Sequence, residues 1–353
     1  MLELPERYKP LGNVALGGMG EVVFCEDVVL ERCVAIKVVQ NSVDQRRMFD
    51  ELAALMRVRS KHVVQVYDYL QLDGRGLGIV QEYVEGDDLF EVDFSNLTIS
   101  EFYKNIWQLA SGISDIHSVG VIHRDIKPNN VKVDPEGVFK IFDFGLARND
   151  GVDASTVGFI GTHGFAAPEL YSSSVEFTNA IDVYAFAATA LYIALGRLPD
   201  QMMRPYQYFG SVDYFCTTRF SIDNHLAAIL NNCLHSDPSL RPSISLVRDE
   251  LQKHILFDSH QALVVYKGQA KYLGSSSRSI NLKVAGVGDV DITYNGLGFF
   301  VTRVAGEVFI NNDAVSTGYV LPGSCVVALG GGWRDNSERA FITFDLSHPE
   351  IVL

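Results

Sequence analysis

Two short segments of the chain hold side chains suited to the transfer of a phosphoryl group. They read His123-Arg-Asp-Ile-Lys-Pro-Asn-Asn130 and Asp143-Phe-Gly145. Transfer from ATP needs a carboxylate that orients a hydroxyl and accepts its proton, together with oxygen ligands for Mg²⁺ beside the triphosphate. The expected base is Asp125, and the expected metal ligands are Asn130 and Asp143. Lys127 adds a cation where negative charge must be stabilised.

The elements that must position these residues change character along the chain. From Leu11 to about Val39, short β-like runs are broken by Gly17-Gly-Met-Gly20, whose amides can approach a phosphate closely. Residues 45–58 switch to helical spacing, and strands are expected at 63–70 and 77–84. A small mixed lobe therefore precedes the catalytic segments.

A larger helical lobe is expected around and after them. A helix is predicted from Thr98 and Glu101, which suit a capping box, to Gly120, a plausible stop. Its apolar face would consist of Phe102, Ile106, Leu109, Ile113 and Ile116. From about 175 to 257 the sequence is again mostly helical, and the apolar run from Val183 to Gly196 is too short to span a bilayer, so it predicts a buried helix.

Beyond about residue 262 the helical spacing disappears, and short β-branched segments alternate with turn signals. The expected strands are Leu263–Tyr266, Ile280–Val284, Val290–Thr293, Phe299–Val304, Val308–Ile310, Cys325–Leu329 and Phe341–Phe344. This pattern is typical of a small all-β sandwich, expected over residues 262–353.

Composition narrows the classes of function. A net charge of −14 argues against a nucleic-acid partner, which needs concentrated Lys and Arg. The five cysteines have no C-x-x-C spacing, so neither a zinc site nor a disulfide framework is indicated. Neither a signal peptide nor a transmembrane segment is visible, so we expect a cytoplasmic protein.

The ordered combination of these motifs resembles the eukaryotic-type protein kinase family over residues 8–257. The resemblance implies an α+β bilobal fold, with a small lobe at about 8–85 and a large lobe at about 86–257. It also implies ATP and Mg²⁺ as cofactors and proteins as substrates. The segment Gly17-Gly-Met-Gly20-Glu-Val22 is similar to bacterial members of the family, which suggests a role in bacterial signalling.

The resemblance assigns a nucleotide site. In the family the glycine-rich loop covers the phosphates, a strand lysine contacts them, and a helix glutamate pairs with that lysine. The following strand segment, the hinge, binds adenine through its backbone, and a polar residue after it meets the ribose. The matching positions here are Gly17, Gly20, Val22, Ala35, Lys37, Glu51, Glu82, Val84 and Asp88, with Gln81 as gatekeeper.

Two positions depart from the family pattern. Ala15 replaces the first glycine of the loop, which stiffens the backbone there. Lys132 stands where an apolar floor for adenine is usual, and its stem can pack there while the ammonium reaches water. Both favour the alternative reading of the chain as a pseudokinase scaffold that binds nucleotide and partners without efficient transfer.

Other residues resemble regulatory and supporting positions. Lys127 matches the Ser/Thr class rather than the Tyr class, and Arg124 is placed to bind a phosphorylated activation loop. The candidate phosphorylation sites are Ser155, Thr156 and Thr162. Two structural roles are also expected: an ion pair between Glu169 and Arg241, and hydrogen bonds from Asp182 to the catalytic loop, with His117 and His163 as structural histidines.

The tail resembles a degenerate forkhead-associated domain, a β-sandwich family that reads phosphothreonine. Gly274 and the segments Asp289–Ile292 and Val308–Asn312 match its framework. The family's arginine after the first glycine is Ser275 here, and no histidine occurs between His260 and His348. We therefore expect a domain that has lost ordinary phosphothreonine binding and contacts the kinase lobe or a protein partner, with Arg278 and Arg303 as substitute cations.

Overall fold

The computed structural model describes residues 4–17, 20–39, 45–72, 76–144, 164–171, 177–203, 213–347 and 349–352. The chain divides into two compact units, Met1–Leu251 and Gln252–Val352. The division falls within the helix Ile244–Ile255, a few residues before the boundary expected from the sequence. Each unit is described by itself.

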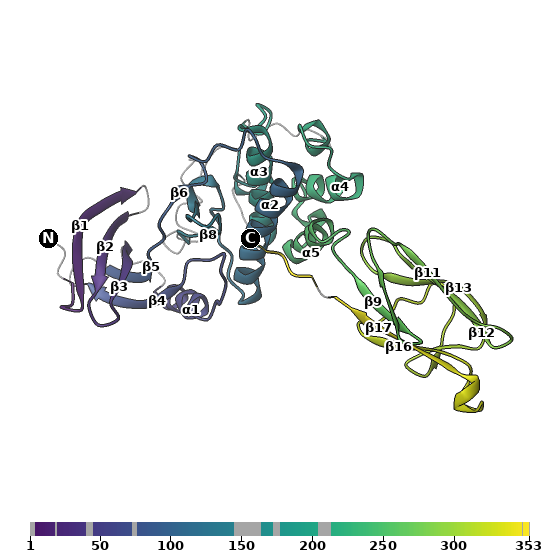
Figure 1. Ribbon diagram of the computed structural model, residues 1–353. Helices are drawn as coiled ribbons and strands as arrows, with labels where there is room; N and C mark the ends of the chain where they lie inside the picture. Colours follow the sequence, from purple (N-terminus) through teal and green to yellow (C-terminus); the bar gives the residue numbers. More distant parts are fainter. Residues whose placement is uncertain are drawn as a thin grey trace. The chain divides into compact units, whose positions relative to one another are not determined.

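The small lobe of the first unit is a five-stranded antiparallel sheet in the order β1-β2-β3-β5-β4 (Figure 1). The strands are β1 (Tyr8–Gly17), β2 (Gly20–Asp27), β3 (Arg32–Val39), β4 (Val66–Leu72) and β5 (Gly76–Glu82). From Val34 onward every residue of β3 is buried, as expected for a central strand. Helix α1 (Gln45–Leu55) follows β3 and buries Met48, Leu52 and Leu55.

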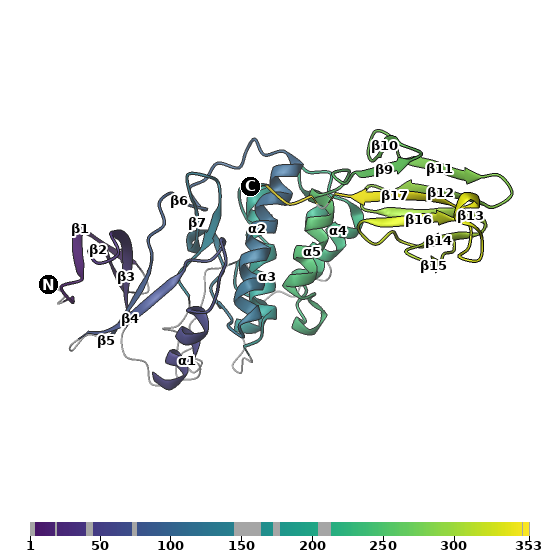
Figure 2. The ribbon, with the colours of Figure 1, turned by 60° about the horizontal axis from the view of Figure 1, so that its bottom comes forward.

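Two helices form the centre of the large lobe. Helix α2 (Ile99–Ser118) begins with the predicted capping box, in which the Thr98 side chain and Glu101 each accept from the other's backbone. Helix α3 (Ala180–Leu195) is buried along almost its whole length and ends at Gly196 in the left-handed conformation. The two helices lie side by side in both ribbon views (Figure 2). The buried helix expected from the apolar run is confirmed.

The remaining elements of the first unit are short. They are the sheet of β6 (Asp87–Asp88), β7 (Val131–Val133) and β8 (Phe139–Ile141), the helices α4 (Asn224–Cys233) and α5 (Ile244–Ile255), and the 3₁₀ turns Pro128–Asn130, Pro168–Tyr171, Phe215–Thr217 and Pro238–Leu240. Within the small sheet, β6 follows the predicted hinge, and β7 and β8 lie between the two predicted catalytic segments.

The second unit consists of two antiparallel sheets around one core. One has the order β10-β9-β17-β16-β14-β15 and the other β11-β12-β13. The strands are β9 (Ala262–Tyr266), β10 (Gln269–Leu273), β11 (Ser279–Val284), β12 (Gly288–Tyr294), β13 (Phe299–Gly306), β14 (Val308–Ile310), β15 (Asp313–Ala314), β16 (Cys325–Leu329) and β17 (Ala340–Leu346). Alternate residues such as Val290, Ile292 and Tyr294 enter the core. Every strand expected from the sequence is present, and β10 and β15 are additional.

No helix in the described part of the chain is long and apolar enough to cross a membrane.

Candidate active site

The catalytic loop holds its three key side chains together by direct contacts. Asn130 Nδ2 donates to the Asp125 backbone oxygen at 2.7 Å and to Asp125 Oδ2 at 2.9 Å. Lys127 Nζ lies 2.9 Å from the same Oδ2. Asp125 is buried, as is Asn130. The structure therefore brings together the predicted base, the predicted phosphate contact and one predicted metal ligand.

Asp182, at the start of α3, holds this loop through hydrogen bonds to its backbone. Its fully buried carboxylate accepts from the backbone amides of His123 and Arg124, both at 2.8 Å, and lies 2.9 Å from His117 Nε2. Burial alone would raise the pKa of Asp182, but the His117 contact and these amide donors leave it lowered. The supporting role predicted for Asp182, and the structural role of His117, are confirmed.

The loop is also tied to the Asp143 segment. His123 Nε2 lies 3.0 Å from the Phe142 carbonyl, and the Phe142 amide donates to the Asn130 carbonyl at 3.0 Å. Burial lowers the pKa of His123, so the ring is neutral and donates to that carbonyl. Arg124 and Asp143 both have positive φ, at 68° and 63°. Such backbone conformations are costly for non-glycine residues, and the surrounding contacts hold them.

The ion pairs around Lys37 correct one expectation. Lys37, buried on β3, pairs with Asp143 Oδ1 rather than with Glu51. Glu51 on α1 instead forms an ion pair with Arg124, whose Nη2 lies 3.0 Å from Glu51 Oε1. The predicted Lys37–Glu51 pair is therefore replaced by two others. The physical reason is position: α1 lies where Glu51 contacts Arg124, the residue before Asp125, while Lys37 contacts the carboxylate of Asp143.

The glycine-rich segment lies between β1 and β2, and its residues 18 and 19 fall outside the described part of the chain. Gly17 pairs with Gly20 at the end of the hairpin, and Val22 lies opposite Lys37 in the pairing of β2 with β3. Ala35 is buried on β3 one alternation from Lys37. Gly17 and Gly20 therefore lie at the same end of the sheet as Lys37.

The hinge follows β5. Glu82 ends that strand and accepts from Lys140 Nζ at 2.7 Å, and Gln81 before it is buried. Val84 lies in irregular structure just after it and is partly buried. Asp88 sits on β6, where its Oδ1 lies 3.4 Å from Lys132 Nζ. The segment that should bind adenine and ribose is thus contacted by two lysines.

The predicted ion pair between Glu169 and Arg241 is confirmed. It is bidentate, with Nη1 to Oε1 at 2.7 Å and Nη2 to Oε2 at 2.8 Å, and it is largely buried. The candidate phosphorylation sites Ser155, Thr156 and Thr162, and also His163, lie outside the described residues. Their roles stay predictions.

Sequence reasoning missed Lys140 and the partner of Lys132. A signal existed in the alternation of the β7 and β8 segments, since paired strands bring Lys132 and Lys140 opposite one another. Their binding to the hinge depends on how β6 docks beside β7, which a single sequence does not specify.

The oxygen donors of the site suit Mg²⁺. The Asn130 amide nitrogen faces Asp125, so its carbonyl oxygen is available to a cation, and Asp143 offers a carboxylate. No group of three or more His, Cys, Asp or Glu side chains within the described ranges forms a dedicated metal cage. One or two protein oxygens completed by substrate phosphates are what Mg²⁺ commonly takes. The residues present fit the ion.

Comparison with known proteins agrees with this geometry. The family model described as "Protein kinase domain" matches residues 8–256, which is more than half of the chain, so the chain belongs to the protein kinase family. The chain is 29% identical over 256 residues to CBL-interacting serine/threonine-protein kinase 8 of Arabidopsis thaliana, a match that covers 69% of this chain and 57% of that protein.

Bacterial relatives give similar matches. A probable serine/threonine-protein kinase of Clostridium acetobutylicum is 31% identical over 206 residues, covering 56% of this chain and 31% of the relative. Serine/threonine-protein kinase pkn3 of Myxococcus xanthus is 30% identical over 210 residues, covering 55% of this chain and 38% of the relative. The matches therefore span between about a third and somewhat more than half of these proteins.

Proposed function

We propose that the chain is a Ser/Thr protein kinase that transfers the γ-phosphoryl group of ATP to protein hydroxyls. The observation that carries the proposal is the contact set of the catalytic loop, in which Asp125 is held by Asn130 and Lys127. The family membership and the names of the relatives support the same activity.

Each residue then has a defined role. Asp125 orients the acceptor hydroxyl and accepts its proton as the oxygen–phosphorus bond forms. Lys127 stabilises charge on the migrating phosphoryl group, and Lys37 contacts the α- and β-phosphates. Asn130 and Asp143 would hold Mg²⁺, which would supply positive charge to neutralise the phosphate oxygens. Glu82 and Val84 offer backbone groups to adenine, and Asp88 offers a carboxylate to the ribose.

Transfer of labelled phosphate from ATP to a generic acceptor such as myelin basic protein, with Mg²⁺ and with EDTA, tests this proposal. We expect incorporation that requires Mg²⁺ and that acid hydrolysis traces to phosphoserine or phosphothreonine. Magnesium-dependent ATP binding without any incorporation would instead favour the pseudokinase scaffold.

We further propose that phosphorylation of the activation loop regulates the enzyme through Arg124. This guanidinium is paired with Glu51, so Glu51 is held away from Lys37. A phosphate on Ser155, Thr156 or Thr162 carries more charge than a carboxylate and competes for Arg124. The released Glu51 then pairs with Lys37, and Asp143 becomes available to Mg²⁺. In this proposal, the protein with Glu51 paired to Arg124 is the resting form of the enzyme.

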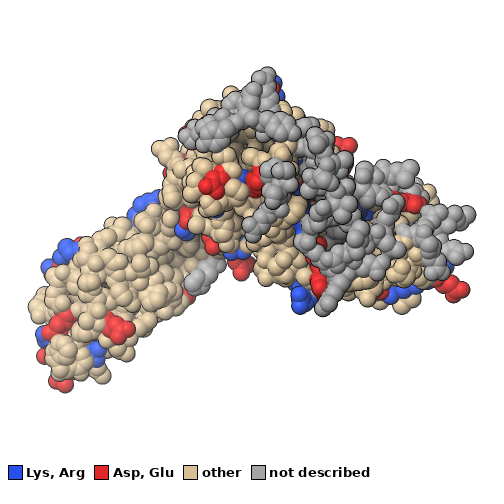
Figure 3. Space-filling view, turned by 180° about the vertical axis from the view of Figure 1, so that it is seen from behind, with Lys and Arg blue, Asp and Glu red and all other residues tan. Residues whose placement is uncertain are grey.

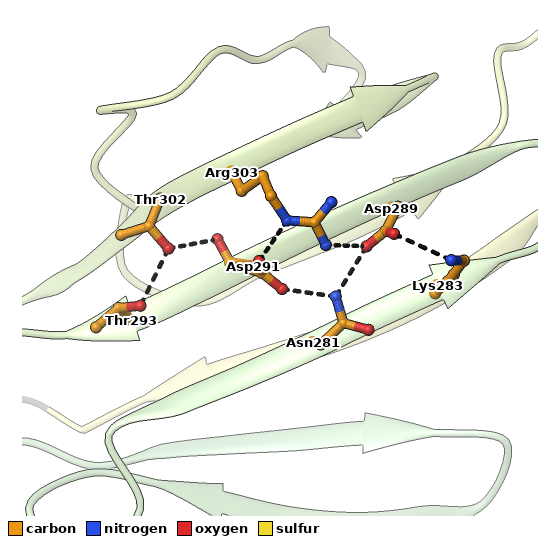
Figure 4. Close-up of polar contacts among 7 residues, drawn as sticks. All are labelled: Asn281, Lys283, Asp289, Asp291, Thr293, Thr302 and Arg303. Atoms are coloured by element: carbon orange, nitrogen blue, oxygen red, sulfur yellow. Dashed lines mark hydrogen bonds and ion pairs between the residues drawn. The ribbon is translucent and has the colours of Figure 1, made fainter.

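The second unit is proposed to be a forkhead-associated-like sandwich without a working phosphothreonine site. Both substitute arginines are already neutralised. Arg278 Nη2 lies 2.5 Å from Asp258 Oδ2. Arg303 binds Asp291 through Nε at 2.6 Å and Asp289 through Nη2 at 2.7 Å, on the outer face of β12 and β13 (Figure 4). A phosphate would have to displace these carboxylates.

The network in Figure 4 holds its carboxylates ionised. Asn281 donates to Asp289 at 2.8 Å and to Asp291 at 2.6 Å. The Asn281 and Arg303 hydrogen bonds lower the pKa of Asp289, and the Arg303 and Asn281 hydrogen bonds lower that of Asp291. Lys283 Nζ also lies 3.4 Å from Asp289 Oδ2, so two cations and two carboxylates balance one another, and neither cation is left over for a phosphate.

A protein partner is the proposed ligand of this unit. Trp333 is 73% exposed, with Phe341 and Val326 also exposed, whereas Phe299 belongs to the core and does not contribute. On the side of this unit seen in Figure 3, a broad area is free of Lys, Arg, Asp and Glu. Exposed aromatic and aliphatic side chains on a surface with few charges suit protein contacts.

Titration of the intact chain with a library of phosphothreonine peptides and their unphosphorylated twins tests this second proposal. We expect no gain in affinity from the phosphate. Micromolar binding that depends on the phosphate and is lost in Arg278→Gln or Arg303→Gln would show that these arginines exchange partners, and the proposal would be wrong.

A further inference from the structure

Four charged residues form one row between the predicted hinge and the small sheet. Asp88 on β6 is opposite Lys132 on β7, and Lys132 is opposite Lys140 on β8. Directly opposed residues of antiparallel strands project to the same face of the sheet. Glu82 joins the row through its ion pair with Lys140. The order of charges across the row is negative, positive, positive, negative.

Two opposed lysines repel one another, and each is directed to an acceptor on the hinge segment. Lys132 Nζ donates to the Gly86 carbonyl at 2.9 Å and lies 3.4 Å from Asp88 Oδ1. Lys140 Nζ donates to Glu82 Oε1 at 2.7 Å. The hinge is therefore fastened at both ends, by Lys140 where β5 stops and by Lys132 where β6 begins.

The backbone fixes the Lys132 end further. Gly86 has a φ of 109°, and a Cβ at this position would collide with the Val133 carbonyl, so the segment after the hinge lies directly against β7. At this contact the Lys132 ammonium donates to the Gly86 carbonyl. One oxygen of Asp88 faces it, and the other takes no hydrogen bond from any described residue.

We propose that Lys132 is a positioning residue for the sugar of the nucleotide. By holding one carboxylate oxygen, it directs the other oxygen of Asp88 at the ribose hydroxyls, and so sets the preference for ribose over 2′-deoxyribose. Fixing the acceptor beforehand reduces the entropy lost when the hydrogen bond forms. The inference rests on the proposed nucleotide site. It gives a function to Lys132, which stands where the protein kinase family usually has an apolar floor for adenine.

The test compares dissociation constants of ADP and 2′-deoxy-ADP for the intact chain by calorimetry, which avoids turnover. A hydrogen bond to a charged group supports a preference for ADP of about tenfold in the unmodified protein. In Lys132→Met the preference should fall to within about twofold of unity, mainly through weaker ADP binding. Lys132→Arg should retain most of it, and Asp88→Asn should lose it.

Lys140→Met is the matched control, because it removes the neighbouring lysine of the same row without touching Asp88. We expect it to keep the ADP preference. An unchanged preference in Lys132→Met, or an equal loss of both nucleotides, would overturn the positioning role while leaving the proposed function intact. Failure of the unmodified chain to bind either nucleotide would overturn both.

Discussion

Arg124 Nη2 lies 3.0 Å from Glu51 Oε1, so the residue before Asp125 is ion-paired with the helix of the small lobe. The Arg124 side chain is 6% exposed and that of Glu51 is 20% exposed. Separating a largely buried pair is costly unless each charge finds another partner. An active arrangement that brings Glu51 to Lys37 separates this pair, and a phosphate on the activation loop would offset that cost at Arg124.

The first prediction concerns this exchange. In the unmodified protein, phosphatase treatment should lower activity by about 10- to 100-fold, the size of a charge-assisted contact. Arg124→Gln should make activity insensitive to the treatment, because the phosphate then has no Arg124 to bind and Glu51 is no longer paired with it. Kinase assays before and after phosphatase measure this, with Arg57→Gln, an exposed arginine of the small lobe, as the control. Continued sensitivity in the Arg124 variant would rule out the exchange.

Asp125→Ala should lower phosphoryl transfer by roughly 10²–10⁴-fold while nucleotide affinity changes little. The reason is that this carboxylate acts on the acceptor hydroxyl rather than on ATP. Initial rates and calorimetry on the same preparations separate the two effects. Asp200→Ala, at an exposed position of the large lobe, should behave as the unmodified protein. Equal rates in the Asp125 variant would exclude this residue as the base.

Asp143→Asn should remove the effect of Mg²⁺ on ATP binding, because the lost charge is the main anionic metal ligand of the site. The measurement is ATP affinity with Mg²⁺ and with EDTA, in the unmodified protein and the variant. Lys37 also loses its partner, so the affinity for metal-free ATP should hold or rise. If Mg²⁺ still tightened binding in the variant, the ligand would have to be another residue.

Stability should depend on His62 below neutral pH. His62 is 2% exposed, and burial lowers its pKa from 6.5 to about 4. Below pH 6.5 the unfolded chain therefore binds a proton that the folded chain does not, so stability falls as pH decreases from 6.5 to 4. The loss should reach roughly 3 kcal/mol.

Urea unfolding at a series of pH values, followed by intrinsic fluorescence, measures this dependence. His62→Gln keeps a donor for the Phe139 carbonyl, which His62 Nδ1 contacts at 3.2 Å, and should flatten the profile between pH 6.5 and 4. His225→Gln, at a side chain that is 72% exposed, should leave the profile unchanged. Identical profiles for His62→Gln and the unmodified protein would contradict the assignment.

Much of the site follows from the sequence because its residues are close along the chain or have a single suitable partner. Asp125 and Asn130 share one loop, and Glu169 reaches Arg241 as predicted. The partner of Lys37 does not follow, since it is Asp143, 106 residues further along the chain, rather than a residue of the neighbouring helix. The choice depends on where α1 rests against the large lobe.

The second unit shows where strand prediction succeeds and stops. Strands such as β12 alternate apolar and polar residues, and the buried set is readable from the sequence. Strand β10 has four exposed residues out of five and no β-branched side chain, and β15 has only two residues. Both lie at the ends of their sheet, where the ladder rather than burial defines the strand.

The place of β17 in the larger sheet has a consequence for how the protein is made. β17 joins β9 on one side to β16 on the other, with Leu346 opposite Ala262 and Phe341 opposite Ala328. During synthesis, β9 and β10 are the first strands of this unit to emerge from the ribosome. The larger sheet stays in two halves until β17 is synthesised. The exposed edges of β9 and β16 are open to pairing with other chains until then. A stop codon shortly before Ala340 would therefore produce a truncated chain that is prone to aggregation. Such a chain would be bound by chaperones or degraded by proteases, and it would not fold into a shortened domain.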